Sequence, residues 1–389
     1  MTISVVFLPG IMGSTLFDGA TKIWPRYRLI IRGTSSSLAD RFMDPSYQLD
    51  PKGLIQDNEM ARVFGKPEIN GYTKTRKFFQ NHGFTILEKK TGWTIPTNSP
   101  ADKLFFEYPY DWRKDLRTTA DLLHEFIRDI VSARGSNPEI HLVGHSMGGL
   151  LSRTYLMKRP NERSKIKKQI FIGTPNHGAP KAYVALRDGT GLLSTGKIAR
   201  NFPKDLHILA RNLPGIYQLL PDERYQGYFF DYGTLVKVGS TREERSIRGT
   251  YIAGDPSSTI YPNSPNEALA HYALSNNNLV NDSLAFRSNE LGRQTFLPDK
   301  TYAIYSTELE TINGLEYKAT PGGKGTYRVL PNSDGTVTER SVYDLVQLVD
   351  DLDNTIPNPK YTRRFSTLSH TELQWKRIVL RCVLGLIFD

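Results

Sequence analysis

Short apolar runs alternate with helix-like segments through the first half of the chain, a pattern that predicts a parallel sheet with crossover helices. Four runs are predicted as buried strands: Val5 to Leu8, Lys103 to Tyr108, Glu139 to Val143 and Gln169 to Ile172. Helices are predicted over Tyr72 to Asn81, Leu116 to Ala133 and Gly148 to Met157. In the second of these, apolar residues recur at spacings of three and four, which gives one buried helical face.

Two stretches break this rhythm. Residues 18–67 and 182–297 are rich in Pro, Gly, Asn and Asp and lack a regular apolar period, which is typical of functional lids or caps in compact folds. Regularity returns with a predicted strand over Thr301 to Tyr305 and a terminal helix over Thr371 to Phe388. The sequence therefore predicts an α/β core made of residues 1–17, 68–181 and 298–389, with cap or lid insertions at 18–67 and 182–297.

Length and composition bound the class of protein. The chain has 389 residues, of which 39% are hydrophobic, enough for one large core with a sizeable insertion. Its single cysteine, Cys382, excludes an internal disulfide and a cysteine zinc cluster. No run reaches the roughly 18 apolar residues of a membrane helix, and the first residues, MTISVVFLPG, lack the regions of a signal peptide. We expect no transmembrane segment, in a protein that is cytoplasmic or exported without a cleaved signal peptide.

The net charge of +10 is partly clustered. Basic residues are dense between Lys158 and Lys168, and Arg363 and Arg364 add two more. A peripheral contact with an anionic membrane surface would fit, at roughly 1 kcal/mol for each basic residue near the lipid, and a solvated face is the alternative. Nucleic acid is not an expected partner, because the chain has neither an RNP motif nor paired Cys and His residues.

The strongest local signal is the G-x-S-x-G pattern in GHSMGG, residues 144–149, directly after a predicted strand and before a predicted helix. That context is typical of a nucleophile elbow, the sharp strand-to-helix turn of the α/β-hydrolase fold. Gly144 and Gly148 fit such a turn because a side chain there would collide with the reversed backbone. We predict Ser146 as the nucleophile, with the helix N-terminus facing the negative charge that develops.

A serine hydroxyl is a poor nucleophile at neutral pH, so it needs a general base and a carboxylate that orients the base. In this fold the acid and then the histidine follow the serine along the chain. His370 is the predicted base, since it alone follows every candidate acid near the C-terminus. Asp334, in an Asp-Gly turn, is the predicted acid. Competing carboxylates, expected on an exposed helix face and at its end, are Asp344, Asp350, Asp351 and Asp353.

An oxyanion hole in this fold uses two backbone N–H groups. One comes from the residue after the nucleophile, which here is Met147. The other is expected from the glycine-containing loop PGIMGS, residues 9–14, after the first strand, and Ile11 is the candidate donor. Further along the chain, Asp111 and Arg113 are predicted to brace the loops around the site as an ion pair.

Five motifs occur in an order that resembles the lecithin:cholesterol acyltransferase-like family of α/β-hydrolases, which includes acyltransferases, phospholipases A and lipases. They are LPGIMGS at 8–14, YDWR at 110–113, GHSMGG at 144–149, SDGTV at 333–337 and His370. The resemblance implies a mostly parallel sheet flanked by helices, with a cap, in an enzyme for acyl-ester lipids. It favours Asp334, because the family's acid lies in a turn of this type. It also implies that Trp24 faces the membrane or the acyl chain, with a buried tryptophan as the alternative.

These residues predict a serine-dependent hydrolase of lipid esters, phospholipase A or lipase-like, that works through a Ser-His-Asp triad and an acyl-enzyme. Three alternatives stay open: an O-acyltransferase with a lipid acyl donor, a carboxylesterase for soluble non-lipid esters, and a non-catalytic hydrolase-fold binding protein. Hydrolysis is favoured because water is always available, whereas a transferase needs an added acceptor site. Acyl transfer through serine needs no metal or organic cofactor, and the sequence has no EF-hand or zinc motif.

Overall fold

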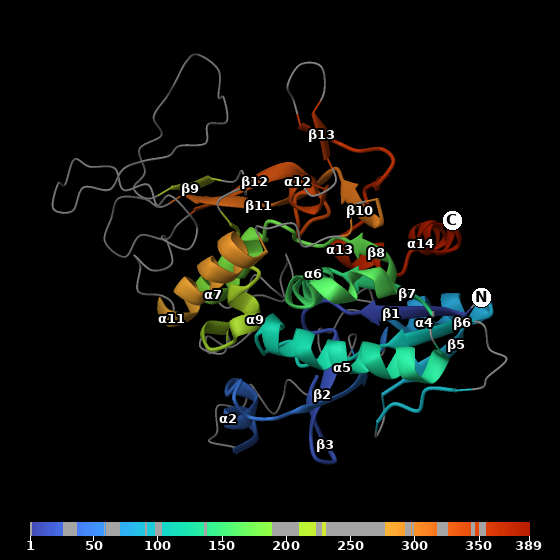
Figure 1. The fold of residues 1–389 in the computed structure, drawn as a ribbon. Helices are drawn as coiled ribbons and strands as arrows, with labels where there is room; N and C mark the ends of the chain where they lie inside the picture. Colours follow the sequence, from blue (N-terminus) through green and yellow to red (C-terminus); the bar gives the residue numbers. More distant parts are fainter. Residues whose placement is uncertain are drawn as a thin grey trace, which may run out of the picture.

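A seven-stranded parallel sheet forms the centre of the molecule (Figure 1). The computed structural model describes residues 2–25, 37–57, 59, 71–89, 92–97, 103–135, 138–188, 210–222, 228–230, 277–291, 297, 299–316, 326–343, 347–349 and 355–389. The strand order is β15, β10, β8, β7, β1, β6, β5, and every neighbouring pair is parallel. Their bounds are β1 (Ile3–Leu8), β5 (Thr85–Glu88), β6 (Lys103–Glu107), β7 (Glu139–His145), β8 (Ile166–Ile172), β10 (Thr301–Thr307) and β15 (Thr362–Ser366).

Helices cover both faces of this sheet. Val6 and Leu8 of β1 belong to an apolar layer shared with α5 (Leu116–Arg134) and α6 (Met147–Lys158). Val5 and Phe7 belong to a second layer, shared with α4 (Thr73–Asn81) and α14 (Arg377–Phe388). Successive side chains of a strand point to opposite faces, so a strand covered on both sides is apolar throughout. This explains why the predicted strands are continuous apolar runs.

A small antiparallel sheet begins in the last residues of the first predicted core segment and continues into the first predicted insertion, where irregular structure was expected. It consists of β2 (Ser14–Asp18), β3 (Thr21–Trp24) and β4 (Asp50–Leu54), with α2 (Ser37–Met43) beside it. Gly19, at φ +56°, closes the β2–β3 hairpin in a conformation that glycine adopts without strain. The strands are short and their polarity is mixed, so they carry no two-residue period that the sequence could reveal.

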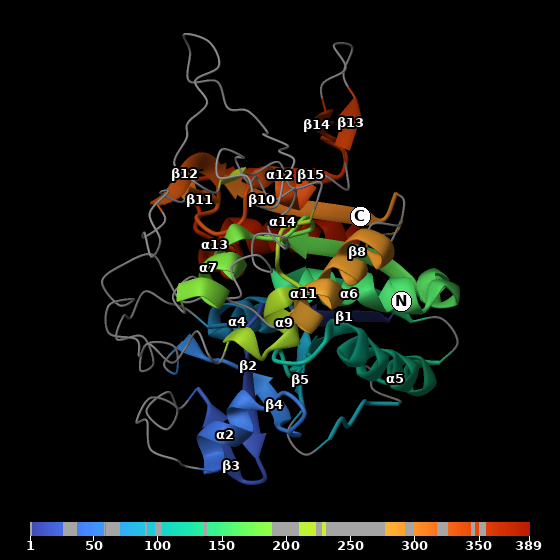
Figure 2. The ribbon, with the colours of Figure 1, turned by 90° about the vertical axis from the view of Figure 1, so that its left-hand side faces the viewer.

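A second small sheet lies on the opposite side of the central sheet (Figures 1 and 2). It contains β11 (Leu309–Glu316), β12 (Thr326–Ser333) and β9 (Tyr228–Phe230). Near it lie α12 (Glu339–Tyr343) and the pair β13 (Gln347–Val349) and β14 (Thr355–Pro357). The described parts of the second predicted insertion hold α7 (Pro180–Asp188), α9 (Pro214–Tyr217), α11 (Asn277–Leu284) and the π-helical turn η3 (Ala285–Glu290). A 3-10 turn, η1 (Pro160–Lys165), leads into β8.

The predicted C-terminal helix is divided into two. α13 (His370–Leu373) is separated from α14 by Gln374 to Lys376, and Lys376 has an extended backbone. Ser369 and Glu372 form a capping box, which fixes the start of α13 at His370. The break has a consequence for the site, because it lets α13 stay at the end of the sheet while α14 packs along its face.

His141, in the middle of β7, makes the fold sensitive to acid. Its side chain is fully buried, and neither ring nitrogen has a hydrogen-bond partner among the described residues. Burial lowers the pKa of His141 from 6.5 to about 3, and the charges of Lys168 and Lys167 act in the same direction. In the unfolded chain the ring takes up a proton near pH 6.5, so the free energy of unfolding falls as the pH decreases from 6.5 towards 3.

We expect a His141→Leu variant to lose less stability in acid than the parent protein. At pH 5 the neutral buried ring costs the folded state about 2 kcal/mol relative to pH 7. Between pH 7 and pH 5, the free energy of unfolding of the variant should therefore fall by about 2 kcal/mol less than that of the parent protein. Denaturant unfolding at the two pH values would measure this difference. An equal loss in both proteins would show that His141 does not titrate on unfolding.

Candidate active site

The predicted site residues come together at one edge of the central sheet, where the parallel strands end. The loop that starts at Pro9 follows β1, Ser146 follows β7, and His370 lies shortly after β15. Open α/β sheets bind their ligands at the carboxyl ends of their strands. We therefore expect the functional site at this edge of the sheet.

Ser146 lies in a strained turn between β7 and α6. Its φ of 52° and ψ of −124° fall in a region that side chains rarely adopt. A Cβ added at Gly144 would lie 2.5 Å from Gly149 Cα, and one added at Gly148 would collide with the carbonyl of Leu8. The strand, turn and helix predicted around GHSMGG are present, and the glycines permit the close approach of α6 to β1 and β7.

Asp334 and His370 form a tightly bonded pair. His370 Nδ1 lies 2.7 Å from Asp334 Oδ2, and the His370 backbone N–H donates to the Asp334 carbonyl oxygen at 2.7 Å. The second carboxylate oxygen, Oδ1, accepts from the backbone N–H groups of Thr336 and Val337, at 3.0 and 2.8 Å. Because an ionised carboxylate only accepts, His370 Nδ1 carries the proton of that bond and Nε2 is left as the basic nitrogen.

Two further strands lead the chain to Asp334, the predicted acid, at this edge. β10 leads through Glu308 into β11, β12 returns antiparallel to it, and Leu309 pairs with Ser333. Asp334 therefore lies beside the end of β10, although 26 residues lie between it and Thr307, the last residue of β10. The competing acids Asp344, Asp350, Asp351 and Asp353 lie outside the described residues.

 The spacing of the motifs alone could not show that Asp334 lies beside the end of β10, because this position depends on how β11 and β12 pair.

The loop from Pro9 to Gly13 folds against Ser146, the predicted nucleophile. A Cβ added at Gly10 would lie 3.0 Å from Ser146 Cβ, so the backbone there is within van der Waals reach of the serine. The N–H of Gly10 is already engaged, because it donates to Tyr72 Oη at 2.8 Å. The next N–H of the loop belongs to Ile11. Met147 is the first residue of α6, and the first N–H groups of a helix have no partner within that helix.

Two residues of this edge were not predicted from the sequence. Gly173, directly after β8, has φ +56°, and a Cβ there would lie 3.0 Å from His370 Nδ1. Lys181, near the start of α7, donates from Nζ to the Gly335 carbonyl and to Thr336 Oγ1, and burial lowers its pKa to about 8. Gly173 could have been suspected as a glycine that ends a strand. Lys181 carried no signal, because it meets the acid turn across 154 positions of sequence.

The predicted pair of Asp111 and Arg113 forms a buried brace next to the site. Arg113 Nε and Nη2 donate to the two carboxylate oxygens of Asp111, at 2.9 and 2.7 Å. The same guanidinium donates to the backbone carbonyls of four residues in and after α2: Arg41, Phe42, Asp44 and Tyr47. Tyr110 Oη donates to the Pro9 carbonyl at 2.8 Å. The YDWR motif thus ties the loop after β6 to α2 and to the loop after β1.

A comparison with protein families gives a match over part of the chain. The family model described as lecithin:cholesterol acyltransferase matches residues 85–237. The match covers less than half of the chain, and over that segment the chain is similar to this family. The matched segment contains the Ser146 elbow and ends before Asp334 and His370. The resemblance predicted from the sequence is confirmed, and it supports an enzyme of the α/β-hydrolase type that acts as a lipid-ester hydrolase or acyltransferase.

The fold is shared with a solved structure of low sequence identity. The Tle4–Tli4 complex gives a TM-score of 0.56 at 14% identity, with 100% of this chain and 99% of that chain covered. The mature lipase BlEst2 of Bacillus licheniformis gives 0.39 at 13% identity, with coverages of 99% and 92%. Carboxylesterase CesB (YbfK) of Bacillus subtilis gives 0.32 at 10%, with coverages of 99% and 84%. No curated protein matches the chain. The seven-stranded parallel sheet with helices on both faces confirms the predicted α/β-hydrolase fold.

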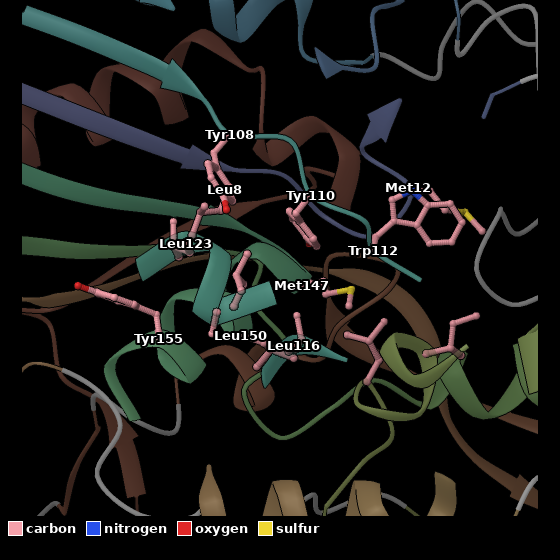
Figure 3. Close-up of a cluster of buried hydrophobic side chains, with 14 of the residues drawn as sticks. Leu8, Met12, Tyr108, Tyr110, Trp112, Leu116, Leu123, Met147, Leu150 and Tyr155 are labelled. Carbon is pink, nitrogen blue, oxygen red and sulfur yellow. The ribbon is translucent and has the colours of Figure 1, made fainter. Parts of the chain in front are cut away.

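Trp24 lies in the core, where the family resemblance had suggested a contact with the membrane or the acyl chain. Its side chain is 4% exposed, and its Nε1–H donates to the Met12 carbonyl at 3.0 Å. The indole stacks on Phe42 and meets Trp112 edge to face. Met12, Tyr110, Trp112 and Met147 belong to the same buried cluster (Figure 3). This burial favours the alternative of a core tryptophan, which here holds the loop that carries Ile11.

The basic run at 158–168 does not form an open cationic surface. Lys158 and Arg159 both bond Asp121, at 2.5 and 2.9 Å, and further ion pairs join Lys165 to Glu162 and Lys167 to Glu139. The run also lies where α6 ends and β8 begins, at the opposite edge of the sheet from Ser146. A membrane bound there would face away from the candidate site. Within the described ranges, no helix is long and apolar enough to cross a membrane.

Proposed function

We propose that the chain is a serine-dependent hydrolase of lipid esters, phospholipase A or lipase-like, with Ser146 as nucleophile, His370 as general base and Asp334 as the acid. The observation that carries the proposal is the 2.7 Å bond between Asp334 and His370 at the sheet edge where Ser146 lies in its strained turn. Lipid esters are the substrate class that the family match supports.

In the proposed reaction, the Ser146 hydroxyl oxygen attacks the ester carbonyl carbon while His370 Nε2 takes its proton. The carbonyl oxygen becomes an oxyanion, which accepts hydrogen bonds from the N–H groups of Met147 and Ile11. Collapse of this intermediate breaks the bond to the alcohol or lysolipid, which takes the proton from Nε2. Water then attacks the acyl-enzyme, with His370 again as the base, and releases the fatty acid.

Asp334 has a defined part in this reaction. Its Oδ2 accepts from His370 Nδ1, which keeps the proton off Nε2 and stabilises the imidazolium that forms. Its Oδ1 is held by the N–H groups of Thr336 and Val337, so the carboxylate cannot rotate freely. Lys181 fastens the same turn through Gly335 and Thr336. The acid is thereby preorganised before substrate binds.

Fatty-acid release from mixed phospholipid vesicles tests the proposal, with the Ser146→Ala variant as the blank. We expect free fatty acid and lysolipid from the parent protein. When a long-chain alcohol is added, an excess of its ester over free fatty acid would identify a transferase instead. Faster turnover of short soluble esters than of vesicles would identify a carboxylesterase, and failure of a fluorophosphonate to label Ser146 would identify a binding protein.

A further inference from the structure

His145, the residue before the nucleophile, is bonded on both sides by groups of the candidate site. Its Nε2 lies 3.1 Å from the carbonyl oxygen of His370, and its Nδ1 lies 3.2 Å from Tyr72 Oη. The rings of His145 and His370 are 5.0 Å apart between centroids. His145 and Tyr72 are each 4% exposed, so water does not compete for these bonds. Because both of its ring nitrogens have partners in the site, His145 can position other groups of the site in addition to forming part of the elbow.

The direction of every bond in this chain of groups can be assigned. The carbonyl of His370 can only accept, so Nε2 of His145 carries the proton. Burial lowers the pKa of His145 to about 3, which keeps the ring neutral and leaves Nδ1 as an acceptor. Tyr72 Oη therefore donates to Nδ1 and accepts from the Gly10 N–H, at 2.8 Å. One continuous path of hydrogen bonds runs from the loop of Pro9 to Gly13, here called the oxyanion loop, to the backbone of the proposed base.

We infer that Tyr72 and His145 are positioning residues, which couple the oxyanion loop to the general base. The inference rests on the proposed function, because it assigns roles to neighbours of His370 and Ile11. Two fixed points hold the His370 backbone: its N–H bonds the Asp334 carbonyl, and its own carbonyl accepts from His145. At the other end, Tyr72 engages the Gly10 N–H, so the next N–H, that of Ile11, is the one offered to the oxyanion.

A matched pair of amide substitutions separates this role from simple packing. In His145→Gln the side-chain N–H₂ can replace Nε2 and still donate to the His370 carbonyl. In His145→Asn the amide is one methylene shorter, so it can reach Tyr72 but not His370. Both variants place a neutral amide in the same buried site, so a purely structural role would affect them alike.

The rate at which a fluorophosphonate labels Ser146 is the readout, because it depends on base and oxyanion hole and needs no identified substrate. We expect His145→Asn to label about 10- to 100-fold more slowly than the parent protein, since small displacements of catalytic groups cost rates of this size. His145→Gln should recover most of the parent rate. With a turned-over ester, the loss should appear in kcat and leave KM little changed. Thermal unfolding checks that the two variants are equally folded.

Tyr72→Phe tests the other end of the path and keeps the aromatic packing. Its labelling should slow roughly 10-fold, the effect of one buried hydrogen bond. Tyr155→Phe is its control, because the Tyr155 hydroxyl is buried on α6 with no hydrogen-bond partner in the described part of the chain. Equal rates for the Gln and Asn variants, or for the two Phe variants, would overturn the inference. Absence of labelling in the parent protein would instead overturn the proposed function.

Discussion

Replacing Ser146 with alanine is expected to lower ester hydrolysis at least about 10⁴-fold, because only the oxyanion hole and substrate binding would remain to accelerate the reaction. The fold should be preserved, since the change removes one oxygen atom from a turn that the surrounding glycines permit. Initial rates on one lipid ester and one soluble ester would measure the loss. Circular dichroism would confirm equal thermal unfolding of the two proteins.

Ser164→Ala is the matched control for that prediction. Ser164 is exposed, in the turn before β8 at the opposite edge of the sheet. The Ser164→Ala variant should hydrolyse both esters at the parent rate and bind one fluorophosphonate per chain, whereas the Ser146→Ala variant should bind none. Substantial turnover by Ser146→Ala would mean that another nucleophile does the chemistry.

Asp334→Asn is expected to lower kcat by about 10⁴-fold, through the tautomer of His370. The Asn carbonyl oxygen will occupy the position of Oδ1, because the N–H groups of Thr336 and Val337 require an acceptor there. The amide N–H₂ then faces His370 Nδ1, which has to accept. The ring proton moves to Nε2, and the histidine can no longer take the proton of Ser146.

The exposed Asp129 of α5 offers a control, since Asp129→Asn removes the same charge far from the site. Its kcat should equal that of the parent protein. For Asp334→Asn, activity should recover in part at high pH, where hydroxide can replace the lost base. A loss of less than about tenfold would count against Asp334 and direct attention to the competing acids.

Much of the core could be predicted because its signals are local. β1, β7 and β8 are apolar runs buried on both faces, and α5 shows its helical period over five turns of sequence. The elbow at Ser146 could be predicted for a similar reason, since its glycines are required by contacts with adjacent residues. Elements without such a period, such as β5 and the hairpin closed by Gly19, were missed.

By itself, the sequence determined the order of the core elements, the turn that strains Ser146 and the place of His370 before the last helix. These depend on alternation, helical period and the steric needs of consecutive residues. Only the tertiary structure decided what surrounds them. Tyr72 meets Gly10 and His145 across 62 and 73 positions, and Lys181 meets the acid turn across 154. Such contacts leave no local pattern, because they arise only when packed strands and helices bring distant segments to one edge of the sheet.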